Sequence, residues 1–301
     1  MKKLFLFLTV LLYFFLHTVT VNAALNIVTT TEDLAAIAKE VAGKHANIIA
    51  LTPGTRDPHF AEARPSMIRQ VHKADILFVV GAELEVGWLP ALVQSSRNSK
   101  LMPGQSGYVD LSRSVSLLGV IKGPVDRSMG DVHAGGNPHY WLDPRNAMPI
   151  SQAMADALSH KDAANADSYQ QNVKNFQTRL SSKLLQWQQQ MSQFKSMPVV
   201  TYHTSFDYLA VAFGLDIRGQ IEPKPGIAPS ASHLAGLIKR IQDERIQAVL
   251  VEPYYEQRSS HMLHSKTGIG VYVIPQSVGS QPEINNYFQL FDAIVAKFQS
   301  K

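Results

Sequence analysis

The segment from Asp162 to Phe194 constrains the fold of this chain more than any other part of it. Large apolar side chains recur there every three or four positions with no glycine or proline between them: Tyr169, Val173, Phe176, Leu180, Leu184, Trp187, Met191 and Phe194. This spacing predicts one amphipathic helix, which at about 1.5 Å per residue extends for about 45 Å. Ordinary helices have about 8–20 residues. We therefore expect a rigid helix that joins two lobes and ends before Pro198.

Strand-like and helix-like patterns alternate on both sides of this segment. Before it, strands are predicted at 25–30, 46–51 and 76–80, and helices at 31–41 and 66–74. After it, strands are predicted at 199–202, 248–251 and 271–274, and helices at 206–213, 232–243, 259–267 and 287–298. Such alternation indicates α/β lobes with parallel sheets flanked by helices. Buried parallel strands give continuous apolar runs of this kind.

The first residues have the features of an export signal. Two lysines precede the apolar run Leu4–Leu16, and small residues stand before a predicted cleavage point after Ala23. A signal peptide has an apolar core of about 7–15 residues, whereas a helix that spans a membrane needs about 20 apolar residues. His17 ends the apolar run before it reaches that length. We expect residues 1–23 to be a signal peptide that is removed, and the mature protein to be in the periplasm.

The rest of the chain is expected to form an N-terminal lobe over 24–161, the linking helix over 162–196 and a C-terminal lobe over 197–301. The sequence has no cysteine, so its lobes rely on hydrophobic cores rather than disulfides, and we expect no lipid anchor. The 28 basic and 24 acidic residues are dispersed. Without a basic patch interleaved with aromatic residues, nucleic acid is not an expected partner.

Three histidines stand where a strand or a short hydrophobic run gives way to a loop. His59 and His139 each follow an Asx-Pro pair, and His203 comes directly after the apolar run 198–202. A preceding proline fixes the path of the chain, and neutral imidazole suits cations such as zinc. Ligands of open α/β sheets bind beyond the carboxyl ends of the strands. We expect these three histidines to bind one cation that bridges the lobes.

Three segments around these histidines together resemble the signature of the ZnuA/TroA-type metal-binding receptors of ABC transporters, which take up zinc and manganese: Asp57–Ser66, Asn137–Pro144 and Tyr202–Tyr208. The resemblance covers essentially the whole mature chain. It implies two α/β lobes, a rigid linking helix and a metal in the cleft between the lobes. It also implies a monomer that delivers metal to an inner-membrane ABC permease, with a periplasmic zinc chaperone as a further candidate partner.

The residue at position 203 carries information about metal selectivity. In this family, receptors that resemble the zinc group have histidine there, and those that resemble the manganese group have glutamate. A nitrogen-rich set of ligands also favours Zn²⁺ over Mn²⁺, which prefers oxygen. We therefore expect a high-affinity zinc receptor. Common catalytic motifs are absent, so we do not expect an enzyme; the alternative is an exported zinc hydrolase that uses the same three histidines.

The fourth metal ligand is left open by the sequence. The family usually supplies an aspartate after a late strand, but the matching stretch Ile274–Gly279 contains no acid. Glu252, which ends the strand 248–251, is the first candidate ligand, and its alternative role is that of a buried acid that stabilises a loop. Gln276 or a water molecule are the other candidates for the fourth position. His133 lies in the glycine-rich stretch 123–138, which we expect to be a plain flexible loop; the alternative is a short form of the histidine- and acid-rich loop that is thought to gather metal in many zinc receptors of this family.

Overall fold

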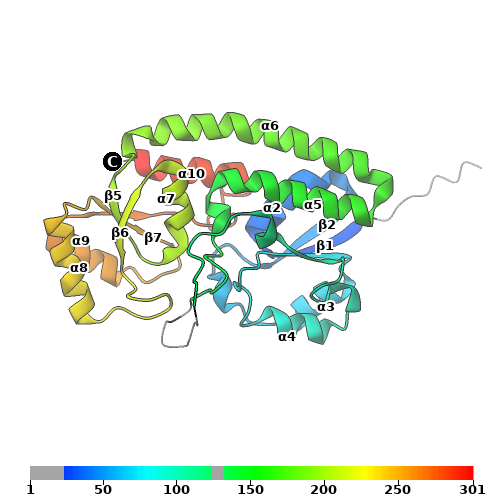
Figure 1. Cartoon of the computed structure of the whole chain (residues 1–301), viewed down its shortest axis with the longest axis horizontal. Coiled ribbons are helices and arrows are strands. Elements are labelled where there is room, and N and C mark those ends of the chain that lie inside the picture. Colours follow the sequence, from blue (N-terminus) through cyan, green and yellow to red (C-terminus); the bar gives the residue numbers. More distant parts are fainter. Residues whose placement is uncertain (1–23, 124–129, 131, 301) are drawn as a thin grey trace, which may run out of the picture.

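The computed structural model describes residues 24–123, 130 and 132–300, so the predicted signal peptide and part of the stretch 123–138 lie outside the described residues. The described chain forms two lobes side by side, with one long helix, α6, running across both (Figure 1). Each lobe contains a four-stranded sheet in which all neighbouring strands are parallel. The predicted α/β class with two parallel sheets is confirmed.

The first lobe has the strand order β2-β1-β3-β4. Its strands are β1 (Leu25–Thr31), β2 (Ala46–Thr52), β3 (Ile76–Val79) and β4 (Tyr108–Asp110). Its helices are α2 (Glu32–Ala42), α3 (Pro65–Lys73), α4 (Leu89–Ser96) and α5 (Ala147–Lys161). The central strands are the most buried, and all four residues of β3 are buried. Helix α2 follows β1 directly because the hydroxyl of Thr31 accepts the N–H of Leu34.

The second lobe repeats this arrangement with the strand order β6-β5-β7-β8. Its strands are β5 (Pro198–Thr201), β6 (Asp216–Gln220), β7 (Ala248–Val251) and β8 (Gly270–Val273). Its helices are α7 (Asp207–Phe213), α8 (Ala231–Asp243), α9 (Arg258–Thr267) and α10 (Tyr287–Gln299). The central strands β5 and β7 again supply the buried apolar runs, and the polar strand β6 lies at an edge.

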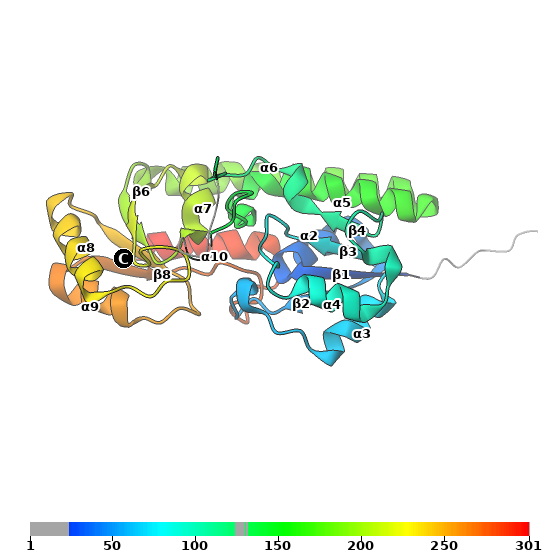
Figure 2. The ribbon, with the colours of Figure 1, turned by 60° about the horizontal axis from the view of Figure 1, so that its bottom comes forward.

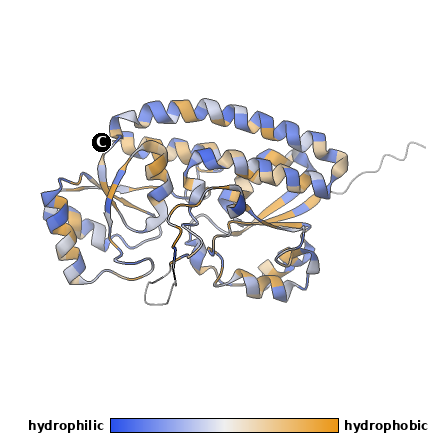
Figure 3. Ribbon diagram, viewed as in Figure 1, coloured by the Kyte–Doolittle hydropathy of each residue, from blue (hydrophilic) through white to orange (hydrophobic). Residues whose placement is uncertain are grey.

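Helix α6 runs from Ala166 to Met191 and is 26 residues long. The predicted helix over 162–194 is shorter in the structure because 3-10 turns replace its first and last turns, at Ala163–Asn165 and Ser192–Phe194. Its apolar stripe is buried against α2 and α5 of the first lobe and against α10. Figure 3 shows hydrophobic and hydrophilic positions alternating along α6. The helix therefore holds the two lobes through one continuous packed face.

The chain crosses between the lobes again after β8, in the segment 274–286. The indole N–H of Trp141 donates to the carbonyl of Gln276 (2.9 Å), and the N–H of Val278 donates to a carboxylate oxygen of Asp33 (2.9 Å). Helix α10 then lies beneath α6 (Figure 2). Because α6 and this segment both connect the lobes, the loops between the two sheets are held in a defined arrangement. Among the described residues, no helix is long and apolar enough to cross a membrane.

Candidate metal centre

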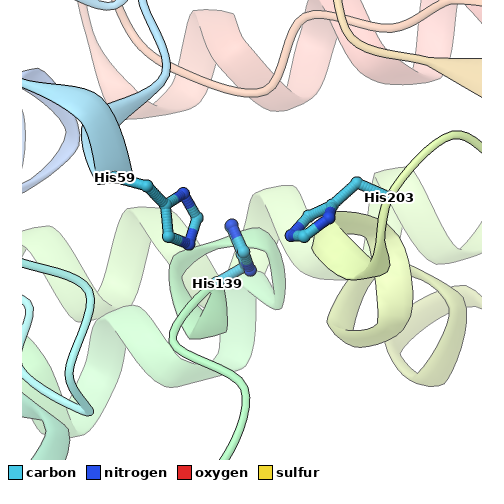
Figure 4. Close-up of side chains that lie close together, drawn as sticks. All are labelled: His59, His139 and His203. Atoms are coloured by element: carbon cyan, nitrogen blue, oxygen red, sulfur yellow. The ribbon is translucent and has the colours of Figure 1, made fainter. Parts of the chain in front are cut away.

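The three histidines singled out in the sequence meet between the lobes. One ring nitrogen from each of His59, His139 and His203 lies within 4.8 Å of the other two. The side chains point toward one another (Figure 4). The residues are buried, with exposed fractions of 8%, 1% and 4%. Imidazoles that converge in this way, away from water, can hold a cation whose ligands come from both lobes.

The two Asx-Pro-His segments build the same local structure. Oδ1 of Asp57 accepts the backbone N–H of His59 (2.9 Å) and contacts its Nδ1 (2.7 Å). Oδ1 of Asn137 likewise accepts the backbone N–H of His139 (3.0 Å) and contacts its Nδ1 (2.8 Å). The Nδ1–H of each ring therefore donates a hydrogen bond to this Oδ1 atom, and each Nε2 is turned toward the centre of the cluster. Burial acts to raise the pKa of Asp57, but the hydrogen bonds and charge of His59 lower it, so Asp57 is a carboxylate.

His203 is oriented by an acid that sequence reasoning missed. Its Nδ1 lies 2.8 Å from Oε2 of Glu222, which also accepts the N–H of Gly226 (3.0 Å). Burial acts to lower the pKa of His203, but the hydrogen bond to Glu222 and the charges of Glu252, Glu222 and Asp57 raise it. These acids favour positive charge at the centre. A carboxylate or amide oxygen behind each ring is the usual support of a metal-binding histidine.

The Nε2 atom of His139 is buried, and no hydrogen-bond partner for it lies in the described part of the chain. Burial, followed by the charges of His59, His203 and His133, lowers the pKa of His139 well below its ordinary value. This ring is therefore neutral, with a lone pair on a buried nitrogen. Buried polar atoms are normally paired, because an unpaired one costs about 1–3 kcal/mol. A metal ion at the centre of the cluster would satisfy this atom.

The two residues considered for the fourth ligand from the sequence are both buried. Glu252 follows β7 and has no exposed surface, and burial raises its pKa to about 7. It is close enough for its charge to act on His203, but it is not among the residues whose ligand atoms lie within 4.8 Å of one another. The side-chain amide of Gln276 donates to the carbonyl of Gly54 (3.3 Å), and its Oε1 is buried with no hydrogen-bond partner among the described residues.

His133, which we expected to lie in a plain flexible loop, contacts the histidine cluster. Its Nε2 lies 3.1 Å from Nε2 of His59, and the two rings are stacked with centroids 5.2 Å apart. The described residues around His133 form a loop without helix or strand, and its ring lies against His59.

The fold and the buried imidazoles together define a two-lobed receptor for a metal ion. The family model described as "Zinc-uptake complex component A periplasmic", or ZnuA, matches residues 27–301, and the chain belongs to this family.

Several known proteins are similar to this chain over nearly its whole length. The metal ABC transporter substrate-binding lipoprotein ScbA of Streptococcus cristatus is 26% identical over 276 residues, which cover 88% of this chain and 84% of that protein. The manganese ABC transporter substrate-binding lipoprotein PsaA of Streptococcus mitis is 25% identical over 277 residues, covering 88% and 85%. A crystal structure of ZnuA superposes with a TM-score of 0.76 at 20% identity, covering 91% of this chain and 98% of that one.

This protein is thus the metal-binding, substrate-binding component of an ABC transporter, and its partner is the permease of that transporter. Members of the family bind substrates for transport and are not enzymes, so the hydrolase alternative is not retained. One of these two relatives is named for manganese and the other for metal in general. The identity of the metal therefore depends on the chemistry of the site in this chain.

Proposed function

We propose that this protein binds one Zn²⁺ through the Nε2 atoms of His59, His139 and His203 and delivers it to an inner-membrane ABC permease. The observation that supports this most strongly is the common orientation of the three rings. Each Nδ1 is held from behind by an oxygen atom at 2.7–2.8 Å, so that Nε2 faces the other two histidines. The buried Nε2 of His139 supplies a second observation, because an incoming cation gives it a partner.

Zinc suits this set of ligands better than manganese does. The group of mutually close ligand atoms found among the described residues is made of imidazole nitrogens only. Zn²⁺ binds imidazole at about 2.0–2.1 Å and accepts four-coordinate tetrahedral geometry. Manganese prefers carboxylate, carbonyl and water oxygens. Although the relative in S. mitis is named for manganese, the histidine at position 203 favours zinc in this chain.

Glu252 was nominated from the sequence as the fourth ligand. We propose that it instead balances charge beside His203, since its carboxyl lies outside the group of mutually close ligand atoms. With a pKa raised by burial to about 7, this carboxyl is readily protonated without metal. A bound cation favours its charged form. Together with Asp57 and Glu222, Glu252 would offset the two positive charges that neutral imidazoles leave on zinc.

The cellular setting is also part of this proposal. We propose a periplasmic monomer from which residues 1–23 have been removed, with lobes over 24–161 and 197–301 and the linking segment over 162–196. The relatives in the two streptococci are named lipoproteins, whereas the printed sequence contains no cysteine and we expected no lipid anchor. A periplasmic zinc chaperone remains a candidate donor of the metal. Mass spectrometry of the mature protein from its own periplasm tests the cleavage and the anchor.

Metal titration of the purified mature protein tests the assignment of zinc. We expect one Zn²⁺ per chain, bound more tightly than Mn²⁺ when the two compete. Replacing His59, His139 or His203 with alanine should weaken zinc binding strongly in each case. His261→Ala, on the exposed face of α9, is the matched control and should bind like the wild type. Wild-type zinc affinity in two of the three cluster variants would refute the assignment.

A further inference from the structure

The hydroxyl of Tyr208 joins the two lobes at the turn that carries His139. Tyr208 is the second residue of α7 and lies in the same lobe as His203. Its hydroxyl donates to the carbonyl of Asn137 and accepts the N–H of Leu118, both at 2.8 Å. The side chain is buried, and burial raises the pKa of Tyr208 to about 12, so the hydroxyl keeps its proton. It therefore both donates to and accepts from the backbone of the first lobe.

Every polar group of Asn137 is hydrogen-bonded in this region. Its N–H donates to the carbonyl of Leu118 (2.7 Å), and its carbonyl accepts the phenol hydroxyl. Its side-chain oxygen holds the ring of His139. Its side-chain amide donates to two groups of the other lobe, the carbonyl of Thr204 (2.8 Å) and Oδ2 of Asp207 (3.1 Å). The first turn of α7 and the residues just before it therefore bind this one asparagine through three groups.

The turn of His59 contacts the other lobe through longer hydrogen bonds. The hydroxyl of Tyr255 donates to Asp57 at 3.3 Å. The side-chain amide of Gln276 donates to the carbonyl of Gly54, also at 3.3 Å. Hydrogen bonds of this length are weaker than those of 2.8 Å. The second lobe therefore holds this turn less firmly than it holds the other Asx-Pro-His turn.

We propose that Tyr208 is a positioning residue for metal binding: its hydroxyl fixes His139 beside His203, so that these two histidines form a pair before zinc arrives. His59 then completes the group of three as the metal binds. This inference rests on the proposed binding of zinc by the three histidines. The rings of the pair have centroids 5.4 Å apart although they belong to different lobes (Figure 4). Ligands that are already held in place lose less conformational freedom on binding, which favours affinity.

The test compares Tyr208→Phe with Tyr169→Phe in the full mature protein. Tyr169→Phe is the matched control, because it also removes a buried phenol hydroxyl, one that donates to Asp162 (2.7 Å) at the beginning of α6. Zinc affinity is measured by competition with a chromogenic chelator, and the geometry of the site by the visible spectrum of bound Co²⁺. We expect Tyr208→Phe to weaken zinc binding by about 3–10-fold and to change the Co²⁺ spectrum. Tyr169→Phe should leave both unchanged, whatever it costs in free energy of unfolding.

A double-mutant cycle separates positioning of His139 from a general loss of stability. If the hydroxyl acts through this ring, Tyr208→Phe weakens zinc binding further in a protein that carries His59→Ala, but not in one that carries His139→Ala. An equal further loss in the two backgrounds would overturn the proposal. A Tyr208→Phe protein with the zinc affinity and the Co²⁺ spectrum of its Tyr169→Phe control would overturn it as well.

Amide hydrogen exchange in the unmodified protein tests the preformed pair without relying on the folding of a variant. We expect residues 117–121 and 137–143 to be protected already without metal, and residues 54–62 to gain protection when zinc is added. A larger gain in 137–143 than in 54–62 would contradict the proposal. If zinc is lost in the alanine variants of the three histidines but Tyr208→Phe behaves like its control, only this inference fails. If zinc binding survives the loss of those histidines, the proposed function itself fails.

Discussion

The side-chain amide of Asn137 donates a hydrogen bond of 2.8 Å to the backbone carbonyl of Thr204, which joins the two lobes beside the histidine cluster. The same amide holds His139 with its oxygen. In the matching segment, Asp57 holds His59 and accepts the hydroxyl of Tyr255 (3.3 Å) from the other lobe. The different partners explain why one segment has asparagine and the other aspartate. The carbonyl of Thr204 needs a donor, which the amide of Asn137 supplies. The hydroxyl of Tyr255 donates to the carboxylate of Asp57.

The first prediction follows from this difference. Asn137→Asp removes the donor to Thr204 and places a second carboxylate near Asp207, whose Oδ2 is 3.1 Å from the Asn137 amide. We expect the free energy of unfolding of the metal-free protein to fall by about 1–3 kcal/mol, as measured by urea denaturation. Asp57→Asn is the matched control, because the hydroxyl of Tyr255 can accept as well as donate, and it should cost less. Equal losses in the two variants would contradict the explanation.

The second prediction concerns the acid behind His203. Glu222→Gln keeps an oxygen that can accept from Nδ1 of His203 but removes the negative charge. We expect zinc affinity to fall by about 10–100-fold, as is typical when the support of a metal-binding histidine is changed. Glu244→Gln removes an exposed acid of the same lobe and should have no effect on zinc. An affinity in Glu222→Gln equal to that of the Glu244 control would show that this charge does not act on the metal.

The third prediction concerns the hydrogen bond between Tyr255 and Asp57, which crosses from one lobe to the other. Tyr255→Phe removes it and keeps the ring stacked on Tyr202, whose centroid is 4.4 Å away. Since such a bond contributes about 0.5–1.5 kcal/mol, zinc should dissociate roughly 2–10 times faster, as measured by stopped-flow transfer to a chelator. Tyr202→Phe loses a bond of the same length to Glu256 within one lobe. If zinc dissociates at the same rate from the two variants, the hydrogen bond between the lobes does not slow its release.

The sequence predicted the four central strands and the edge strands β2 and β8, but it missed the edge strands β4 and β6. Strands β3, β5 and β7 are mostly apolar, and most residues of these strands and of β1 are buried, because each has a neighbouring strand on both sides. Strand β4 has only three residues, and β6 reads Asp-Ile-Arg-Gly-Gln, so neither shows a buried apolar run. Both lie at sheet edges, where pairing with one neighbour defines the strand. Periodicity of apolar residues cannot report such strands.

The sequence also predicted part of the candidate site: it pointed to three of its histidines and missed Glu222. His59, His139 and His203 were found because each begins a loop after a hydrophobic run, and the structure brings them together. Glu222 was missed because it follows the polar edge strand β6, which gave no signal of its own. The place of His133 depends on contacts of its turn with Glu83, which is 50 residues earlier in the chain. Contacts over such separations are set by tertiary packing and leave no local pattern.

The last prediction concerns Asp33, which joins α2 to the returning segment 274–286. Its carboxyl accepts from the hydroxyl of Ser277 and the N–H of Val278. Burial raises its pKa from 3.8 to about 7, although these hydrogen bonds oppose the rise. Between these two values the unfolded chain loses this proton while the folded protein keeps it. The contribution of Asp33 to stability is therefore full below about pH 4 and declines as the pH rises toward 7, by on the order of 4 kcal/mol.

Asp33→Asn removes this titration. We expect the free energy of unfolding of the variant, relative to the wild type, to increase steadily from pH 4 to pH 7 and to level off above that. Urea denaturation of the metal-free proteins at several pH values measures the difference, so that the titration of all other groups cancels. Asparagine lacks the second acceptor for Ser277, so the variant can be less stable than the wild type at pH 4. The test therefore depends on how the difference in free energy of unfolding changes with pH, and not on its value at one pH. Parallel curves for the two proteins would mean that Asp33 is ionised in the folded state, held by Ser277 and Val278 strongly enough to outweigh its burial.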